Sequence, residues 1–240
     1  MSRTRVKRYS VRALWRFCED GIFAVPEIQR EFVWDKWRAA NLLDSIDRHL
    51  PIGTILIWAT DTKRRHLLRH STEVLPPHAD DNKRIWFIID GQQRICVLHR
   101  VKVGNIIRND RGAEIDFGRL CLSFDGRYDA KFMFVRRPIP KTHIPVVQIL
   151  AGNWRNRLKH LSKGKMSVVE EFRRKMMSYK LPVVFVETNS LDDVRETFLR
   201  INSGGLRISE ADRAFSRAAR LDLRRLVKEL RKPLPRGFDE

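Results

Sequence analysis

The clearest structural pattern in the chain lies at residues 85–94, which read Ile-Trp-Phe-Ile-Ile-Asp-Gly-Gln-Gln-Arg. Its first five residues form a continuous apolar run with the length of one buried strand. The run ends abruptly at Asp90, and apolar side chains then recur at helical spacing at Ile95, Leu98 and Val101. The sequence therefore predicts a strand that passes through a polar turn into a helix.

The polar turn has the components of a phosphate site. A helix that begins here directs its unpaired backbone N–H groups and the positive end of its dipole at a ligand, and Gly91 allows close approach. Arg94 adds a cation that can grip phosphate oxygens in a bidentate manner. It also opposes the helix dipole at a cost of roughly 0.3–1 kcal/mol, which a nearby anion would relieve. Asp90 could cap the helix, hold Mg²⁺ or orient a water molecule.

An ordinary helix start is the alternative interpretation, in which Asp90 is a simple N-cap and Gln92, Gln93 and Arg94 are surface residues. Two adjacent glutamines directly after a buried strand favour a site, because α/β proteins bind ligands at the C-terminal ends of their strands. The motifs GxxxxGKS/T, GxGxxG and HExxH do not occur in the sequence. Their absence argues against a P-loop enzyme, a dinucleotide enzyme and this type of zinc site.

The pattern around this segment predicts a mixed α/β fold. Asp35 is the expected N-cap of an amphipathic helix that reaches Leu50 and is closed by Pro51 and Gly53, although Asp47 interrupts its apolar face. We expect further strands at residues 54–58, 119–124, 131–135 and 181–186, helices at about 145–179 and from Ser190 onward, and an exposed loop at 60–84.

The composition points to a soluble protein with a polyanionic partner. The 240 residues include 48 Lys and Arg against 29 Asp and Glu, and this formal net charge of +19 favours nucleic acid, nucleotide phosphates or an anionic surface. No apolar stretch of about 18 residues occurs, so we expect a cytoplasmic protein without a membrane partner. Cys18, Cys96 and Cys121 lie far apart, and each is expected to be a small buried residue.

Basic side chains are concentrated in two regions. Residues 1–20 carry six basic side chains and no acid in their first 16 positions, which predicts a phosphate-contacting arm or a solvated, mobile start. Residues 127–180 carry fourteen basic side chains against three acidic ones. We expect a basic helical insertion at about 145–180 within a domain spanning 21–215, and a helical extension at 216–240. A solvated helical face is the alternative to a DNA surface, for which the candidate residues are Arg136, Arg137, Arg155, Arg157, Lys159, Arg173 and Arg174.

Four sequence blocks follow one another along residues 25–215. They are Pro26-x-x-Gln29-Arg30-x-x-Val33-Trp34, Leu43-x-Ser45-Ile46 with Pro51-Ile52-Gly53, Ile88-Ile89-Asp90-Gly91-Gln92-Gln93-Arg94, and Ile201-Asn202-Ser203-Gly204-Gly205 with Ser209-Glu210-Ala211. Together they resemble the N-terminal domain of GmrSD-type modification-dependent restriction endonucleases. The chain departs from that pattern at Ile28, where the family commonly has an aromatic residue, and at Cys96 and Val97, where it often has threonines.

The resemblance implies a ParB/sulfiredoxin-like α/β fold with a small mixed sheet, followed by a mainly helical C-terminal part. In that family the DGQQR motif is taken to bind and hydrolyse nucleoside triphosphates, and so to regulate an attached nuclease in phage defence. The broader ParB-like GxxR phosphate motif maps to Gly91 and Arg94. Relatives usually continue into further helices and an effector domain, so we expect the extension at 216–240 to be incomplete relative to the family.

These expectations give each candidate residue a role in an Mg²⁺-dependent NTPase. Asp90 or Gln93 would position the metal ion or a water molecule, and Asp90 is the expected metal ligand. The expected phosphate and nucleotide contacts are Gln29, Arg30, Gly91, Gln92 and Arg94, and the expected pocket wall is Asn202, Ser203, Gly204 and Gly205. The implied partners are modified duplex DNA and a nuclease effector domain or subunit, and the oligomeric state is left open.

Two other functions compete with this hypothesis. In the first, the protein is a DNA-binding module whose charge is its function, and the DGQQR turn grips a DNA phosphate without nucleotide turnover. In the second, the ParB-like core is itself a nuclease. The second is the weaker of the two, because the sequence has no clustered carboxylate or histidine metal site.

Overall fold

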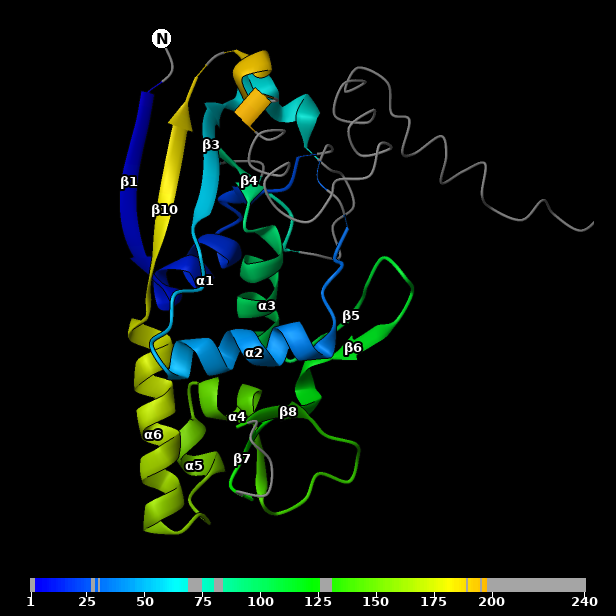
Figure 1. Cartoon of the computed structure of the whole chain (residues 1–240), viewed down its shortest axis with the longest axis vertical. Coiled ribbons are helices and arrows are strands. Elements are labelled where there is room, and N and C mark those ends of the chain that lie inside the picture. Colours follow the sequence, from blue (N-terminus) through cyan, green and yellow to red (C-terminus); the bar gives the residue numbers. More distant parts are fainter. Residues whose placement is uncertain are drawn as a thin grey trace, which may run out of the picture. The chain divides into compact units, whose positions relative to one another are not determined.

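The computed structural model describes residues 3–26, 29, 31–68, 75–79, 84–125, 131–188, 190–194 and 196–197. The chain divides into two compact units, Met1–Asn189 and Ser190–Glu240. The first unit is a mixed α/β structure built around a five-stranded sheet with the order β1-β10-β3-β4-β2 (Figure 1). The predicted α/β class is therefore confirmed, whereas the likeness to the ParB and sulfiredoxin folds stays a prediction.

The centre of the sheet is formed by the strands that the sequence predicts most clearly. β3 (Ile55–Asp61) pairs antiparallel with β4 (Arg84–Asp90) and parallel with β10 (Lys180–Glu187). β2 (Phe23–Ala24) lies parallel to β4 at one edge. Trp58 of β3 and Phe87 of β4 are buried and stack with ring centroids 5.4 Å apart. These apolar side chains hold β4 in the core. Asp90, its last residue, is the first position of the strand's apolar stretch to be polar and partly exposed.

Two helices follow strands β2 and β4 in the chain. α2 (Lys36–Asp47) begins as predicted at Asp35, whose carboxylate accepts a hydrogen bond from Arg38 N at 2.8 Å. α3 (Gln92–Val103) follows β4 after a single residue, Gly91, and buries most of its side chains. Gly91 therefore occupies the N-cap position, and the expectation that Asp90 caps this helix is wrong.

Residues 3–19 form a strand and a helix of the first unit, so they are not the predicted arm. Arg3–Ser10 forms β1, which pairs antiparallel with β10 along its full length, and Val11–Glu19 forms α1. Ser10 caps α1 by accepting a hydrogen bond from Ala13 N at 3.2 Å. Four side chains of α1 are buried, namely Val11, Leu14, Trp15 and Cys18. Because these four side chains are buried, the segment belongs to the core of the first unit. The basic side chains around them concealed this helical pattern in the sequence.

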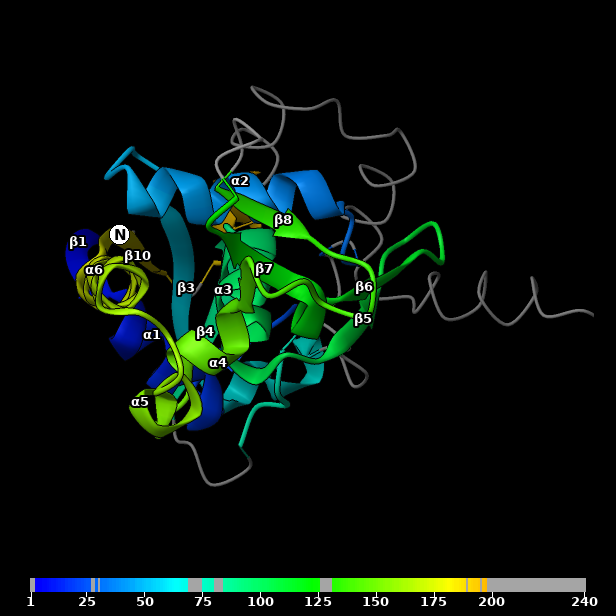
Figure 2. The ribbon, with the colours of Figure 1, turned by 90° about the horizontal axis from the view of Figure 1, so that it is seen from below.

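Smaller elements complete the first unit. The strands predicted near residues 120 and 133 are present, and the helical stretch predicted at 145–179 is divided into three helices. Viewed along α6, in Figure 2, the β7–β9 sheet lies beside α2. The elements are β5 (Ile106–Arg108), β6 (Glu114–Asp116), β7 (Leu120–Ser123), β8 (Phe132–Phe134), β9 (His143–Pro145), α4 (Val146–Leu150), α5 (Trp154–Arg157), α6 (Lys163–Ser178), and the 3₁₀ helices η1 (Thr62–Leu67) and η2 (Phe117–Arg119).

The buried carboxylate of Asp47 joins α2 to α6 and to Lys131. Asp47 is 7% exposed, and its oxygens lie 2.6 Å from Lys131 Nζ and 3.5 Å from Lys175 Nζ. Lys175 also pairs with Glu171, one turn away on α6, at 2.9 Å. Asp47 therefore interrupts the apolar face of α2 because its carboxylate forms ion pairs that connect α2 with α6.

The cysteines and the chain end agree with the sequence where the structure describes them. Cys18, Cys96 and Cys121 are buried and free, and burial raises the pKa of Cys96 and of Cys121 to about 12. In the second unit, residues 191–194 and 196–197 are helical, and Ser190 Oγ accepts a hydrogen bond from Asp193 N at 3.1 Å, as its capping pattern predicts. The expected domain boundary at 215/216 lies outside the described residues.

Candidate functional site

Three segments that are distant in sequence meet where β4 turns into α3. They are the turn itself, residues 88–94, the loop 51–54 that leads into β3, and the segment 29–34 that precedes α2. Polar side chains of the four predicted residues Gln29, Asp90, Gln93 and Arg94 make the connections. The sequence predicted that these four residues gather at one place, and in the structure they do.

Arg94 is the centre of this arrangement. Its Nη1 donates to the carbonyl oxygens of Ile52 at 3.2 Å and Thr54 at 2.8 Å, and its Nη2 donates to Asp90 Oδ2 at 3.0 Å. Gly53 lies between the two carbonyls with φ +86°, and a Cβ at this position would be 2.4 Å from Arg94 Nη1. Only glycine combines this left-handed backbone with such a close approach of the guanidinium. Arg94 therefore anchors the loop as well as facing the turn.

Gly91 is required for a separate reason. Its φ is +89°, and a Cβ there would lie 2.4 Å from Ile55 Cδ1. It caps α3 without any side-chain cap hydrogen bond. The start of α3 thus has the backbone geometry in which N–H groups and the positive helix end face an anion.

The two glutamine side chains act on the backbone. Gln93 Oε1 accepts hydrogen bonds from Val33 N at 2.9 Å and Trp34 N at 3.3 Å, and its Nε2 donates to Glu31 O at 3.0 Å. Gln29 Nε2 donates to the carbonyl oxygens of Ile88 and Ile89 at the end of β4. Both side chains are buried, so their amides hold the 29–34 segment against the turn. This geometry favours a positioning role for Gln93, whose predicted catalytic role stays a prediction.

The residues at the turn fit a Mg²⁺ ion that arrives with phosphates. Mg²⁺ is commonly bound through one or two carboxylates together with substrate phosphates and waters. Asp90 is 35% exposed and uses only one oxygen for Arg94, so the second oxygen can serve as a metal ligand. Within the described ranges, no group of three potential metal ligands is present, so Asp90 would bind such an ion only with help from the ligand.

The other predicted site residues are Gln92, Arg30 and the pocket wall. Gln92 is buried at the first turn of α3. Arg30 and the predicted wall Asn202, Ser203, Gly204 and Gly205 lie outside the described residues.

The predicted DNA-binding residues are mostly exposed, and two of them converge. The guanidinium carbon atoms of Arg155 and Arg173 lie 4.8 and 5.4 Å from the ring centroid of Trp154. Burial, followed by the charge of Arg12, lowers the pKa of Arg173. The other five are exposed and do not join this cluster through any contact within the described part of the chain: Arg136, Arg137, Arg157, Lys159 and Arg174.

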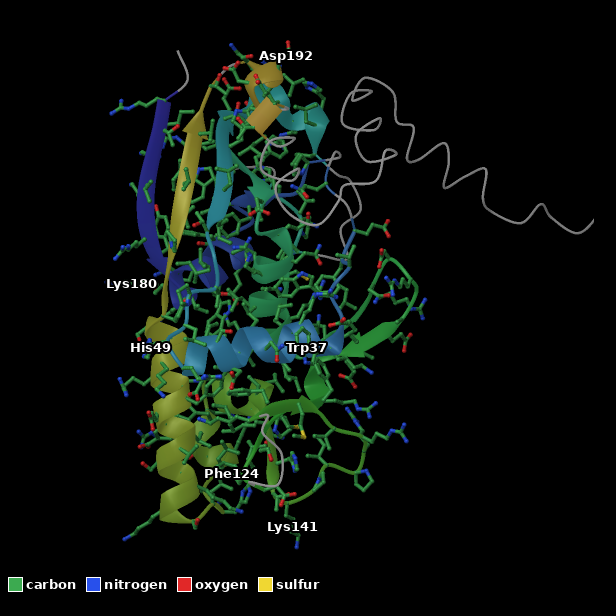
Figure 3. The ribbon with its side chains drawn as sticks, in the orientation of Figure 1. Trp37, His49, Phe124, Lys141, Lys180 and Asp192 are labelled. Carbon is green, nitrogen blue, oxygen red and sulfur yellow. The ribbon has the colours of Figure 1, made fainter. Side chains whose placement is uncertain are left out.

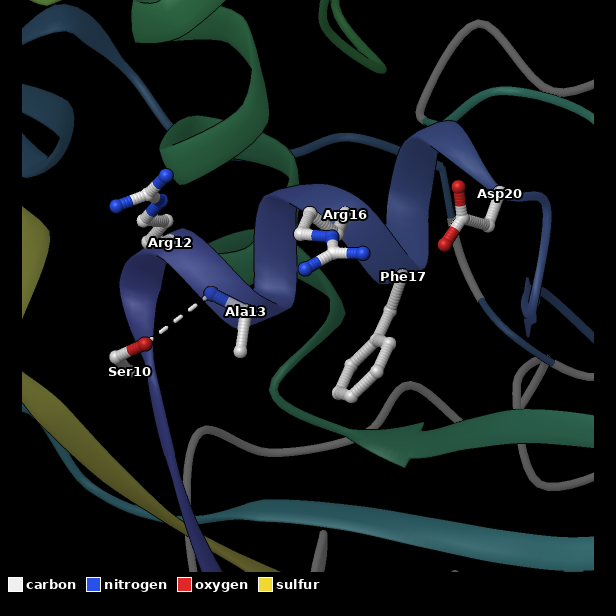
Figure 4. A pocket seen from close by; sticks show the side chains of 6 residues that line it. All are labelled: Ser10, Arg12, Ala13, Arg16, Phe17 and Asp20. Carbon is white, nitrogen blue, oxygen red and sulfur yellow. Dashed lines mark hydrogen bonds between the residues drawn. The ribbon is translucent and has the colours of Figure 1, made fainter.

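A groove on α1 was not anticipated from the sequence. It has a volume of about 400 Å³ and is lined by Ser10, Arg12, Ala13, Arg16, Phe17 and Asp20 (Figure 4). The spacing of Arg12 and Arg16, four residues apart on a helix, is the signal that could have revealed it. The groove adds two more cations to the side of the molecule that carries β1.

Comparisons with known proteins identify one family. The model of the GmrSD restriction endonuclease N-terminal domain matches residues 14–218. An uncharacterized protein of Methanocaldococcus jannaschii is 22% identical over 230 residues, which cover 82% of this chain and 39% of that protein. The chain thus spans about two fifths of the length of the curated relative that it matches.

Proposed function

Since the chain belongs to the family of GmrSD restriction endonuclease N-terminal domains, we propose that it binds and hydrolyses a nucleoside triphosphate at the Asp90–Arg94 turn. Hydrolysis would regulate a nuclease domain or subunit that restricts modified duplex DNA, as a defence against phage. The observation that carries the proposal is the position of Arg94, which is fixed by three hydrogen bonds beside the start of α3, where no side chain caps the helix.

Arg94 retains donors for a phosphate. A guanidinium has five N–H groups, and the contacts to Ile52, Thr54 and Asp90 leave Nε–H and one Nη2–H without a partner among the described residues. The side chain is 17% exposed, so these donors are only partly desolvated before a ligand binds. A guanidinium held in one orientation loses little entropy when it grips phosphate oxygens.

Some of the other residues would contact the nucleotide or its metal ion, and the rest would hold the neighbouring backbone in position. Asp90 would hold Mg²⁺, which supplies charge neutralisation for the phosphates when bound. Gly91 and Gln92 would present backbone N–H groups at the start of α3. Gln29 and Gln93 would keep the 29–34 segment in place. The nucleotide contact of Arg30 and the pocket wall at Asn202–Gly205 stay predictions from the family resemblance.

Phosphate release tests the proposal. The full chain is incubated with each of four nucleoside triphosphates and Mg²⁺, with and without duplex DNA. We expect release that falls by about tenfold or more in Asp90→Asn, because a bound metal ion contributes several kcal/mol to phosphoryl transfer. The matched control is Asp35→Asn, a carboxylate at another helix start that caps α2. Equal rates in both variants, or no release in the wild type, would contradict the proposal.

A second candidate function is DNA binding by the basic surface. The observation that favours it is the pair of arginines on Trp154, since the buried indole holds the exposed guanidinium of Arg155 at the surface, where it can contact phosphates. We expect DNA affinity that falls steeply with salt and is reduced in Arg155→Ala.

The helices within the described residues are all too short or too polar to cross a bilayer, and we propose a cytoplasmic location. DNA binding and nucleotide turnover are compatible with each other.

A further inference from the structure

The loop that Arg94 anchors lines a cleft of about 490 Å³. Its walls are the loop 51–54, the junction of α6 with β10, the end of α2 and one residue of β1. His49 and Lys180 mark it in Figure 3, at the point where α2, α6 and β10 meet. The volume lies within the range of roughly 300–1,000 Å³ that is typical of small-molecule sites.

The cleft is positively charged. Arg8 of β1 pairs in register with Pro182, and Ser10 pairs with Lys180, so Arg8 and Lys180 are diagonal neighbours on one face of the sheet. No acidic residue lines the cleft, and neither cation forms an ion pair with any described residue. Two like charges at this spacing repel each other, and an anion between them would reverse that effect.

The ends of two helices work against this charge but do not cancel it. α2 and α6 both end at the cleft, and a helix C-terminus carries the equivalent of about half a negative charge. Two such ends offset about one of the two positive charges. The carbonyls of α2 are also occupied, because His49 N donates to Ile46 O at 3.1 Å and Leu50 N donates to Ser45 O at 2.7 Å. The cleft therefore keeps a net positive potential.

The loop offers a backbone donor on the cleft side. The carbonyl and N–H groups of a trans peptide point in opposite directions. Because the carbonyl oxygen of Ile52 points at Arg94, the N–H of Gly53 points away from it, and Gly53 lines the cleft. The same peptide thus joins Arg94 on one side to the cleft on the other.

His49 is held beside the cleft in a costly conformation. Its φ is +56°, in the C′ position of α2 where glycine is usual, and a side chain in this region costs roughly 1–2 kcal/mol. Its ring stacks on Tyr179 with centroids 6.4 Å apart, and Tyr179 is fixed by a hydrogen bond from its hydroxyl to Leu50 O at 2.7 Å. The strain lies in the backbone at the end of α2, and it places the imidazole of His49 beside the basic cleft.

We propose that this cleft binds the phosphate groups of a ligand through Arg8, Lys180, Gly53 N–H and His49. It is a second site, separate from the start of α3, and the loop 51–54 connects the two. The proposal does not depend on nucleotide hydrolysis. The phosphate can come from a free nucleotide or from a DNA backbone, and both present the same oxygen chemistry to these groups.

A titration of the full chain with inorganic tripolyphosphate tests the proposal. The readout is the NMR signal of the His49 imidazole, identified by its loss in His49→Gln. We expect the wild type to bind, and the double variant Arg8→Ala with Lys180→Ala to bind about 10- to 30-fold more weakly, as expected for two partly exposed charge-assisted contacts. The control double variant, Arg111→Ala with Lys141→Ala, removes the same charge from exposed positions outside the cleft and should bind as the wild type does.

Equal weakening in both double variants, or no response of His49 in the wild type, would overturn the proposal. If the alanine variant does not fold, Arg8→Gln with Lys180→Gln replaces it. Parallel titrations with ATP and with a short DNA duplex identify the source of the phosphate, and a His49 response to either supports the site. Asp90→Asn separates the two proposals, because loss of hydrolysis with an unchanged His49 response leaves the cleft intact.

Discussion

Replacement of Gly53 by alanine tests the loop anchor directly. The new Cβ would be placed 2.4 Å from Arg94 Nη1, which donates to both Ile52 O and Thr54 O. Because a contact this short cannot be kept, either the guanidinium or the loop must move. The variant should therefore lose part of the connection between the turn and β3.

The cost has two parts that the structure separates. Alanine with φ near +86° costs roughly 1–2 kcal/mol wherever it occurs, because its Cβ approaches the carbonyl. Displacement of a charged donor from two carbonyls adds roughly 1.5–3 kcal/mol. We therefore expect Gly53→Ala to lower the free energy of unfolding by about 2.5–5 kcal/mol.

Gly112 is the matched control for this experiment. Its φ is +75°, but nothing lies within 4 Å of a Cβ built there, so Gly112→Ala should cost only the backbone part. Urea unfolding of both variants gives the difference. In an Arg94→Ala background, the cost of Gly53→Ala should fall to that of Gly112→Ala, since the clash is gone. Equal costs for the two glycine variants in the wild-type background would refute the reasoning.

Three further predictions follow from named contacts. Gln93→Met should lower the free energy of unfolding by about 2–4 kcal/mol, because it removes three partly buried hydrogen bonds to the backbone of residues 31–34, whereas Gln148→Met on α4 should cost little in the same urea assay. Burial lowers the pKa of His99 to about 4, so below pH 6.5 only the unfolded chain gains its proton. Stability should then fall by up to about 1.4 kcal/mol per pH unit between pH 6.5 and 4, and His99→Phe should lessen this slope in acid-unfolding curves. His49→Gly should raise thermal stability by about 0.5–1 kcal/mol while weakening tripolyphosphate binding, and a loss of stability would contradict the strain at this position.

The part of the fold that the sequence predicts is the part built from local patterns. The apolar run before Asp90 and the helical spacing after it give β4 and α3 in the right order, and Asp35 marks the start of α2. β1 could not be predicted this way, since its partner is β10 and its register depends on residues at the other end of the unit. α1 was readable, because its buried residues follow helical spacing, but the charges around them concealed it.

The composition of the site was predictable, but its hydrogen bonding was not. The predicted gathering of Gln29, Asp90 and Arg94 is present, since Asp90 and Arg94 follow the buried strand β4 and the amide of Gln29 donates to the end of that strand. The partners of Gln93 lie about 60 residues away in sequence, and no local pattern shows that its amide binds backbone groups. The buried pair of Asp47 with Lys131 is similar: the break in the apolar face was visible, but its cause required the fold.

The most direct test of nucleotide binding at the DGQQR turn is an affinity measurement. The dissociation constant of a non-hydrolysable nucleoside triphosphate with Mg²⁺ is compared for the wild type, Arg94→Ala and Arg111→Ala, under conditions in which each is fully folded. We predict that Arg94→Ala weakens binding by about tenfold or more, the loss expected for one charge-assisted contact to phosphate, while Arg111→Ala binds as the wild type does. Equal affinity of all three proteins would contradict the assignment of the nucleotide to this turn.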